Sequence, residues 1–133
     1  MKEDPEIRSR IMRAVKGENT TPELIVRRLA FAMGYRFRLH RKDLPGKPDL
    51  VFPGKHKVIF VHGCFWHAHD CARGARMPKA NRAYWLNKIA RNSVRDKANS
   101  AALQSRGWRV AVIWECELKH IDRVKARVAK FLA

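Results

Sequence analysis

The chain has 133 residues, of which 46% are apolar and 31% are charged. That length supports one domain with a hydrophobic core and is short for two. Lysine and arginine number 29 against 12 aspartate and glutamate, giving a formal net charge of +17. Such a charge repels itself unless a polyanion neutralises it, and a nucleic-acid duplex does so by releasing condensed counterions. Anionic lipid is the alternative, disfavoured because no segment combines a basic face with an aromatic stripe.

Targeting and cross-linking signals are missing from the sequence. No run approaches eighteen apolar residues, and the first ten, MKEDPEIRSR, lack the hydrophobic region of a secretion signal. Three cysteines are an odd number, which is a poor basis for a disulfide framework. These features predict a soluble, intracellular protein with one domain over residues 1–133 and no membrane segment.

Apolar spacing predicts two helices in the N-terminal quarter. Residues 5–16 place their apolar side chains on one helical face, and the GENTT stretch then breaks the helix. Thr21 suits an N-cap and Pro22 suits the first helical position, so the second helix should run from Pro22 to about Met33. Gly34 then ends it.

Four segments read as strands. Residues 35–39 alternate apolar and basic side chains, the period-2 pattern of a half-buried strand. DLVF, residues 49–52, should form a hairpin through PGKHK with VIFVH, residues 58–62, which is apolar on both faces. WRVAVIW, residues 108–114, is also continuously apolar, as expected for a central strand.

Two further helices complete the order. Residues 83–106 form a long basic helix ended by Gly107, and a last helix carries an apolar stripe from Leu118 to Phe131. The order is two helices, three strands, a loop rich in cysteine and histidine, then helix, strand and helix. It predicts an α/β domain, a mixed sheet flanked by helices.

The loop stretch VHGCFWHAHDC has metal-ligand spacing, and Cys116 follows the strand 108–114. One Cys3His set uses every cysteine of the chain: Cys64, His69, Cys71 and Cys116. Structural zinc takes four such ligands, and parallel neighbouring strands would bring Cys64 and Cys116 together. His67 or Asp70 is an alternative to His69. The other interpretation is a buried apolar Cys116 and two incidental cysteines.

A second constellation lies on the hairpin. Asp49 follows Pro48 at the start of one strand, and the partner strand ends at His62, so the carboxylate can face the imidazole. Phosphodiester hydrolysis needs a hard cation such as Mg²⁺ on oxygen ligands and a base for the water. Asp49 is a candidate ligand, and His62 and His67 are candidates for proton transfer. A plain turn aspartate is the alternative.

The hairpin resembles the PD-(D/E)xK nuclease signature with its second half changed. Phe60-Val61-His62 stands where that signature has an acid and a lysine two positions apart. PGKPDLVF, VIFVHGCFWHAHDC, YWLNKIARNSVRD and LQSRGWRVAVIWECEL closely resemble the very-short-patch repair (Vsr) endonucleases of bacteria. The resemblance runs in register from about Ser9 to Leu118 and covers most of the chain.

That resemblance implies a restriction-endonuclease-like α/β core with a structural Zn²⁺ site on the same Cys3His set. It also implies an enzyme that uses Mg²⁺ to nick the thymine-containing strand on the 5′ side of a T:G mismatch. Asp49 would bind Mg²⁺, with the Val61 backbone carbonyl as a further ligand. His67 would be the general base, and the zinc loop would orient it. Glu23 and His62 would assist.

The resemblance also assigns contacts with DNA. Phe65, Trp66 and Trp85 would wedge into the base stack beside the mismatch, where unstacking costs less. The alternative is that Phe65 and Trp85 are core residues, and for Trp85 taken alone this interpretation is favoured. Met12 would reach the minor groove from an N-terminal DNA-contacting segment, residues 1–20. The basic side chains of the long helix, Lys88 and Arg91, would contact phosphates.

The expected partner is therefore double-stranded DNA with a T:G mismatch, met by a monomer in the bacterial cytoplasm, at the nucleoid. Contacts with mismatch-repair proteins and the role of Asp96 stay open. Two alternatives stay open as well. One is a strand-nicking endonuclease of related fold with a different target site, and the other is a zinc-containing DNA-binding module without catalysis.

Overall fold

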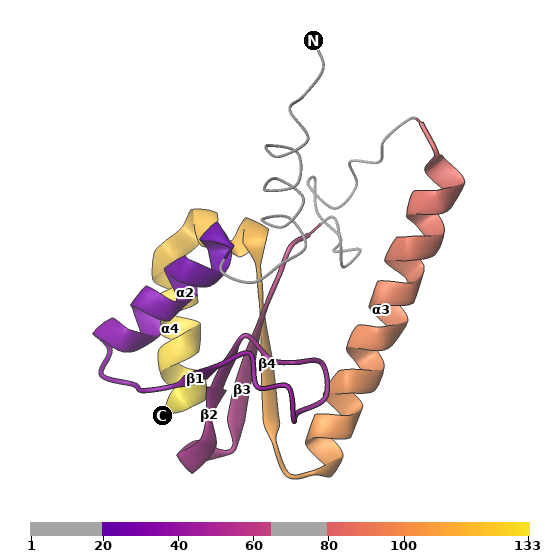
Figure 1. The fold of residues 1–133 in the computed structure, drawn as a ribbon. Coiled ribbons are helices and arrows are strands. Elements are labelled where there is room, and N and C mark those ends of the chain that lie inside the picture. The colour runs from indigo at the N-terminus through magenta and orange to yellow at the C-terminus, as the bar shows by residue number, and fades with distance from the viewer. Residues whose placement is uncertain (1–19, 65–79) are drawn as a thin grey trace, which may run out of the picture.

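The computed structural model describes residues 20–64 and 80–133, and Figure 1 shows their arrangement. Its elements are α2 (Thr21–Ala32), β1 (Arg38–Leu39), β2 (Leu50–Phe52), a 3-10 turn (Pro53–Lys55), β3 (Lys57–His62), α3 (Arg82–Ser105), β4 (Arg109–Trp114), a 3-10 segment (Glu115–His120) and α4 (Ile121–Leu132). The predicted α/β class and the long basic helix are confirmed. Among these residues no helix is long and apolar enough to cross a membrane.

The four strands form one mixed sheet in the order β1-β2-β3-β4. β2 and β3 are the predicted antiparallel hairpin, and Leu50 lies opposite Ile59. β3 and β4 are parallel, and their register ends with His62 opposite Trp114. The chain therefore leaves β3 and β4 at the same end of the sheet. Within the described residues β4 is the outer strand of this order, so the central position predicted for residues 108–114 is wrong.

Strand alternation divides the core between the two faces of this sheet. One face packs against α2 and α4 through a cluster of buried side chains that includes Leu50, Ile59 and Val128. The other face packs against α3 through a smaller cluster that includes Val58, Phe60 and Leu103. Figure 1 shows α2 and α4 on one side of the strands and α3 on the other.

Three predicted boundaries are wrong. The N-cap of α2 is Thr20, because its hydroxyl accepts the Glu23 N–H at 3.4 Å, and Thr21 is already helical. The strand expected over residues 35–39 shrinks to β1, although Tyr35 and Phe37 pack edge-on against Phe52 as their alternation predicts.

The apolar stripe of the last helix also begins outside it. Leu118 belongs to the 3-10 segment, and α4 starts only at Ile121. The helix expected over residues 5–16 lies outside the described residues, as does nearly all of the DNA-contacting segment 1–20.

Candidate active site and metal centre

Three polar side chains from separate elements meet beside the sheet. Glu23 lies in the first turn of α2, His40 directly follows β1, and Asp49 directly precedes β2. Their carboxylate oxygens and imidazole nitrogen all lie within 4.8 Å of one another. Among the described residues this is a candidate site for a metal ion, formed by two acids and one histidine.

Glu23 is the most enclosed member, with 2% of its surface exposed. Its Oε2 accepts a hydrogen bond from Arg27, one turn further along α2, and lies 3.1 Å from His40 Nε2. A buried carboxylate is costly unless charged or hydrogen-bonding partners satisfy it. Arg27 and His40 are such partners, and they fix the direction of the Glu23 side chain.

Asp49 is held by the neighbouring strand. The Val61 N–H donates to Asp49 Oδ2 at 2.6 Å, and Asp49 Oδ1 lies 3.7 Å from His40 Nε2. Burial, with the adjacent Glu23 carboxyl as second cause, raises the pKa of Asp49 to about 8. Two carboxyl groups in one site tend to share a proton. A bound cation removes that need, so the pair is suited to hold one.

His40 was missed from the sequence. It adopts the left-handed conformation at φ 48°, which is uncommon for a residue with a Cβ. Its side chain is 10% exposed and points to Glu23 and Asp49. The one available signal was a histidine at the end of an alternating segment, and no spacing rule connects that position to either acid.

His62, the last residue of β3, lies among aromatic rings. Its ring is buried, 5.2 Å from the Trp114 ring in an edge-on arrangement and 5.5 Å from Phe60. The hairpin register directs the Asp49 carboxylate to the Val61 backbone. The cluster within the described ranges contains His40, which the sequence did not predict, and the expected role of His62 stays a prediction.

The predicted meeting of two cysteines is confirmed. Cys64 and Cys116 follow the parallel strands β3 and β4, and the Cys116 N–H donates to Cys64 Sγ at 3.3 Å. Cys64 is fully buried. His69 and Cys71, the other members of the expected zinc set, lie outside the described residues.

The expected DNA contacts are described only on α3. Trp85 is half-buried and lies edge-on to Tyr84 at 5.2 Å, with Lys88 Nζ 5.9 Å from its ring centre. Arg91 is exposed. The remaining predicted positions lie outside the described residues: Met12, Phe65, Trp66 and His67.

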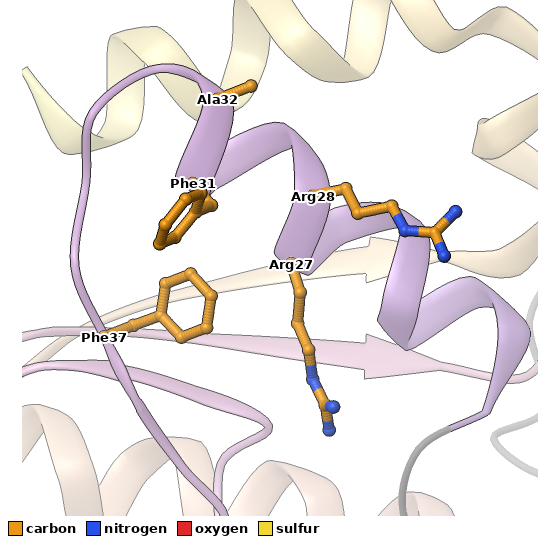
Figure 2. A pocket seen from close by; sticks show the side chains of 5 residues that line it. All are labelled: Arg27, Arg28, Phe31, Ala32 and Phe37. Carbon is orange, nitrogen blue, oxygen red and sulfur yellow. The ribbon is translucent and has the colours of Figure 1, made fainter.

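A shallow apolar hollow adjoins the cluster along α2. Its volume is about 310 Å³, and Figure 2 shows the side chains that line it: Arg27, Arg28, Phe31, Ala32 and Phe37. Arg27 belongs to both places, since it lines the hollow and binds Glu23. The acids themselves do not line it, so the chemistry lies beside this hollow rather than in it.

Comparisons with known proteins identify the family of the chain. The family model described as DNA mismatch endonuclease Vsr matches residues 2–73. The type II nicking enzyme V.XorIIP of Xanthomonas oryzae pv. oryzae is 52% identical over 96% of this chain and 93% of its own. The DNA mismatch endonuclease Vsr of Escherichia coli is 40% identical over 91% of this chain and 77% of its own.

A solved structure gives the same answer for the fold. The catalytic domain of homing endonuclease I-Bth0305I superimposes with a TM-score of 0.58 at 26% identity, over 85% of this chain and 94% of that domain. The family match spans more than half of the chain and carries Glu23, His40 and Asp49 within it. The chain therefore belongs to the Vsr family of DNA mismatch endonucleases and is an endonuclease.

Proposed function

We propose that this chain is a strand-nicking DNA endonuclease that hydrolyses one phosphodiester bond with a divalent metal ion held at Asp49. The observation that carries the proposal is the enclosed cluster of Glu23, His40 and Asp49. Two acids that share so small a volume in a protein of charge +17 are better explained by a cation than by stability.

We assign Mg²⁺ to this site, because carboxylate and carbonyl oxygens are its preferred ligands. Asp49 would hold it with the Val61 backbone carbonyl, and bound Mg²⁺ would polarise the phosphate and make a water molecule more acidic. The Val61 N–H fixes the Asp49 carboxylate toward β3. Glu23 and His62 would assist, and His67 would accept the proton of the attacking water.

The target is the second part of the proposal. A type II nicking enzyme of Neisseria meningitidis serogroup A, V.NmeAIP, is 43% identical over 85% of this chain. Together with V.XorIIP, it favours a nick at a specific site over a nick at every T:G pair. A T:G mismatch, cut 5′ to the thymine, is the second candidate, supported by the family model and the Escherichia coli relative.

DNA would be held by the long helix and by the segments around it. Lys88 and Arg91 would bind phosphates, which position a duplex without reading its sequence. Trp85, with Phe65 and Trp66, would wedge beside a weakened base pair, and Met12 would contact the minor groove. The half-buried Trp85, with one face beside Lys88, fits a ring that is anchored yet accessible.

A structural Zn²⁺ is a further part of the proposal, supported by the contact of Cys64 with Cys116. Zinc thiolate sites of four ligands contribute directly to folding. We expect one zinc per chain by elemental analysis, and Cys64→Ser protein to lose that zinc and unfold at lower temperature. Retention of one zinc by the Cys64→Ser protein would contradict the assignment.

The deciding experiment is cleavage of end-labelled duplexes with Mg²⁺ and without it. Duplexes with one T:G pair and with the matched T:A pair would be compared in several flanking sequences. A Mg²⁺-dependent nick on one strand, lost in Asp49→Ala protein, would establish the enzyme, and the preferred duplex would identify the target. Tight binding without a cut on any duplex would overturn the proposal.

A further inference from the structure

We propose that His40 is a ligand of the catalytic metal ion and shifts the preference of the site from Mg²⁺ toward Mn²⁺. The inference rests on the proposed function for the position of the ion. It adds a ligand that the nuclease signature does not contain, and with it a prediction about which ion the protein binds more tightly.

The distances suit three ligands on one ion. A single atom, His40 Nε2, faces both acids, at 3.1 Å from Glu23 Oε2 and 3.7 Å from Asp49 Oδ1. Neighbouring ligands on an octahedral ion with bonds of about 2.1 Å lie roughly 3.0 Å apart. The distances from the imidazole nitrogen to the two oxygens therefore exceed that ligand spacing by less than about 1 Å.

The backbone directs the His40 side chain toward the two acids through a conformation of higher energy. Its φ of 48° is a conformation that a Cβ disfavours, and such positions cluster where the surrounding structure fixes a functional side chain. The ring is 10% exposed and has Arg27 as a further neighbour, with the guanidinium nitrogen 3.5 Å from Nε2. The imidazole is thus directed into the cluster and away from water.

Ligand chemistry then sets the preferred ion. Mg²⁺ favours oxygen ligands in a strict octahedron and gives up its bound water molecules reluctantly. Imidazole nitrogen suits transition metals such as Fe, Ni and Zn, and Mn²⁺ is the member of that series which also favours the carboxylate oxygens that Mg²⁺ prefers. A site of two carboxylates and one imidazole should therefore bind Mn²⁺ more tightly, relative to Mg²⁺, than the same site without the imidazole.

The test is calorimetric titration of the DNA-free protein with MnCl₂ and, separately, with MgCl₂. His40→Gln is the test variant, and His120→Gln, at an exposed histidine before α4, is the matched control. We expect His40→Gln to lower Mn²⁺ affinity about tenfold, the low end for loss of a partner in a metal site, and Mg²⁺ affinity much less. The control should change neither.

Equal loss of both affinities would overturn the inference, since a residue that only orients Glu23 has no reason to discriminate between ions. Unchanged affinities would overturn it too. His40→Asn is the second variant if glutamine destabilises the fold, because asparagine tolerates a positive φ.

Nicking assays separate this inference from the proposed function. The rate of nicking with Mn²⁺ would be divided by the rate with Mg²⁺ for each protein. If this ratio is the same in His40→Gln and unaltered protein, the inference is wrong and the proposed function stands. If His40→Gln selectively loses Mn²⁺ affinity and the unaltered protein cuts no duplex, His40 is a metal ligand and the proposed function is wrong.

Discussion

The helices α2 and α3 cover opposite faces of one sheet and differ in what they bury. α2 has 12 residues and buries a charged side chain, Glu23, together with Val26 and Ala30. α3 has 24 residues, and its buried positions are Ile89 and Leu103. The shorter helix thus buries a side chain of the candidate active site, and the longer one leaves most of its side chains accessible to solvent.

That difference separates two tasks of a nuclease. Groups that act on a bond must be held in fixed directions, and burial with hydrogen-bonding partners does this for Glu23 and Asp49. Groups that bind a polyanion need to be reachable and positively charged, as Arg91 and Arg95 are on α3. The comparison predicts that changes on α2's side alter chemistry and pH response, whereas changes on α3 alter anchoring and DNA affinity.

The largest expected effect is on the anchor of α3. Leu103 is fully buried among Val51, Val58 and Phe60, so Leu103→Ala should lower the free energy of unfolding by about 2–5 kcal/mol. Val94, on the same helix, is 70% exposed, and Val94→Ala should change it by less than about 0.5 kcal/mol. Urea unfolding measures both. Equal effects would mean that α3 is not fastened mainly through Leu103.

The second prediction concerns the pH dependence of stability on the α2 side. The pKa of Asp49 is about 8 in the folded protein and about 3.9 in an unfolded chain. Between these values the unfolded state loses its proton first, so this group's contribution to stability is complete below about pH 4 and is lost as the pH rises toward 8. Asp49→Asn should therefore stabilise the metal-free protein at pH 8 by on the order of a few kcal/mol, and little at pH 4.

Thermal unfolding at the two pH values measures this difference, in buffers freed of Mg²⁺ without a chelator strong enough to remove zinc. Added Mg²⁺ should stabilise the unaltered protein at pH 8 and leave Asp49→Asn unchanged, because the ion favours the ionised carboxylate. A variant that is less stable than the unaltered protein at pH 8 would show that Asp49 is not strained by its neighbours.

The sequence predicts those parts of the site that lie on regular elements. The hairpin places Asp49 beside β3, and parallel strands bring Cys64 to Cys116, because strand pairing follows from apolar runs and turn residues. His40 follows a strand of two residues and reaches the acids through a left-handed turn. The sequence of such a loop has no repeating apolar pattern, so the position of His40 is set by tertiary packing and cannot be predicted from spacing.

Arg27 illustrates the same limit from within a helix. Its spacing of four from Glu23 predicts an ion pair on a helix surface, where such pairs contribute little. The structure instead buries that pair against His40, and the burial gives it a role in the site. Periodicity locates a residue on a face of a helix, but the loops around it decide whether that face is covered.

The smallest effect is expected for one basic side chain of α3. Removing a single phosphate contact by Lys88→Ala should weaken duplex binding several-fold and reduce the slope of log K against log salt by about 0.9. Lys125→Ala on α4, exposed on the other side of the sheet, is the matched control and should leave both unchanged. Fluorescence anisotropy between 50 and 200 mM salt, about the range over which such slopes are resolved, measures this. Should Lys125→Ala reduce the slope and Lys88→Ala leave it unchanged, DNA would lie on the α4 side. The division of tasks between α2 and α3 would then fail, because the phosphate contacts would come from the side of the sheet that also holds the acids.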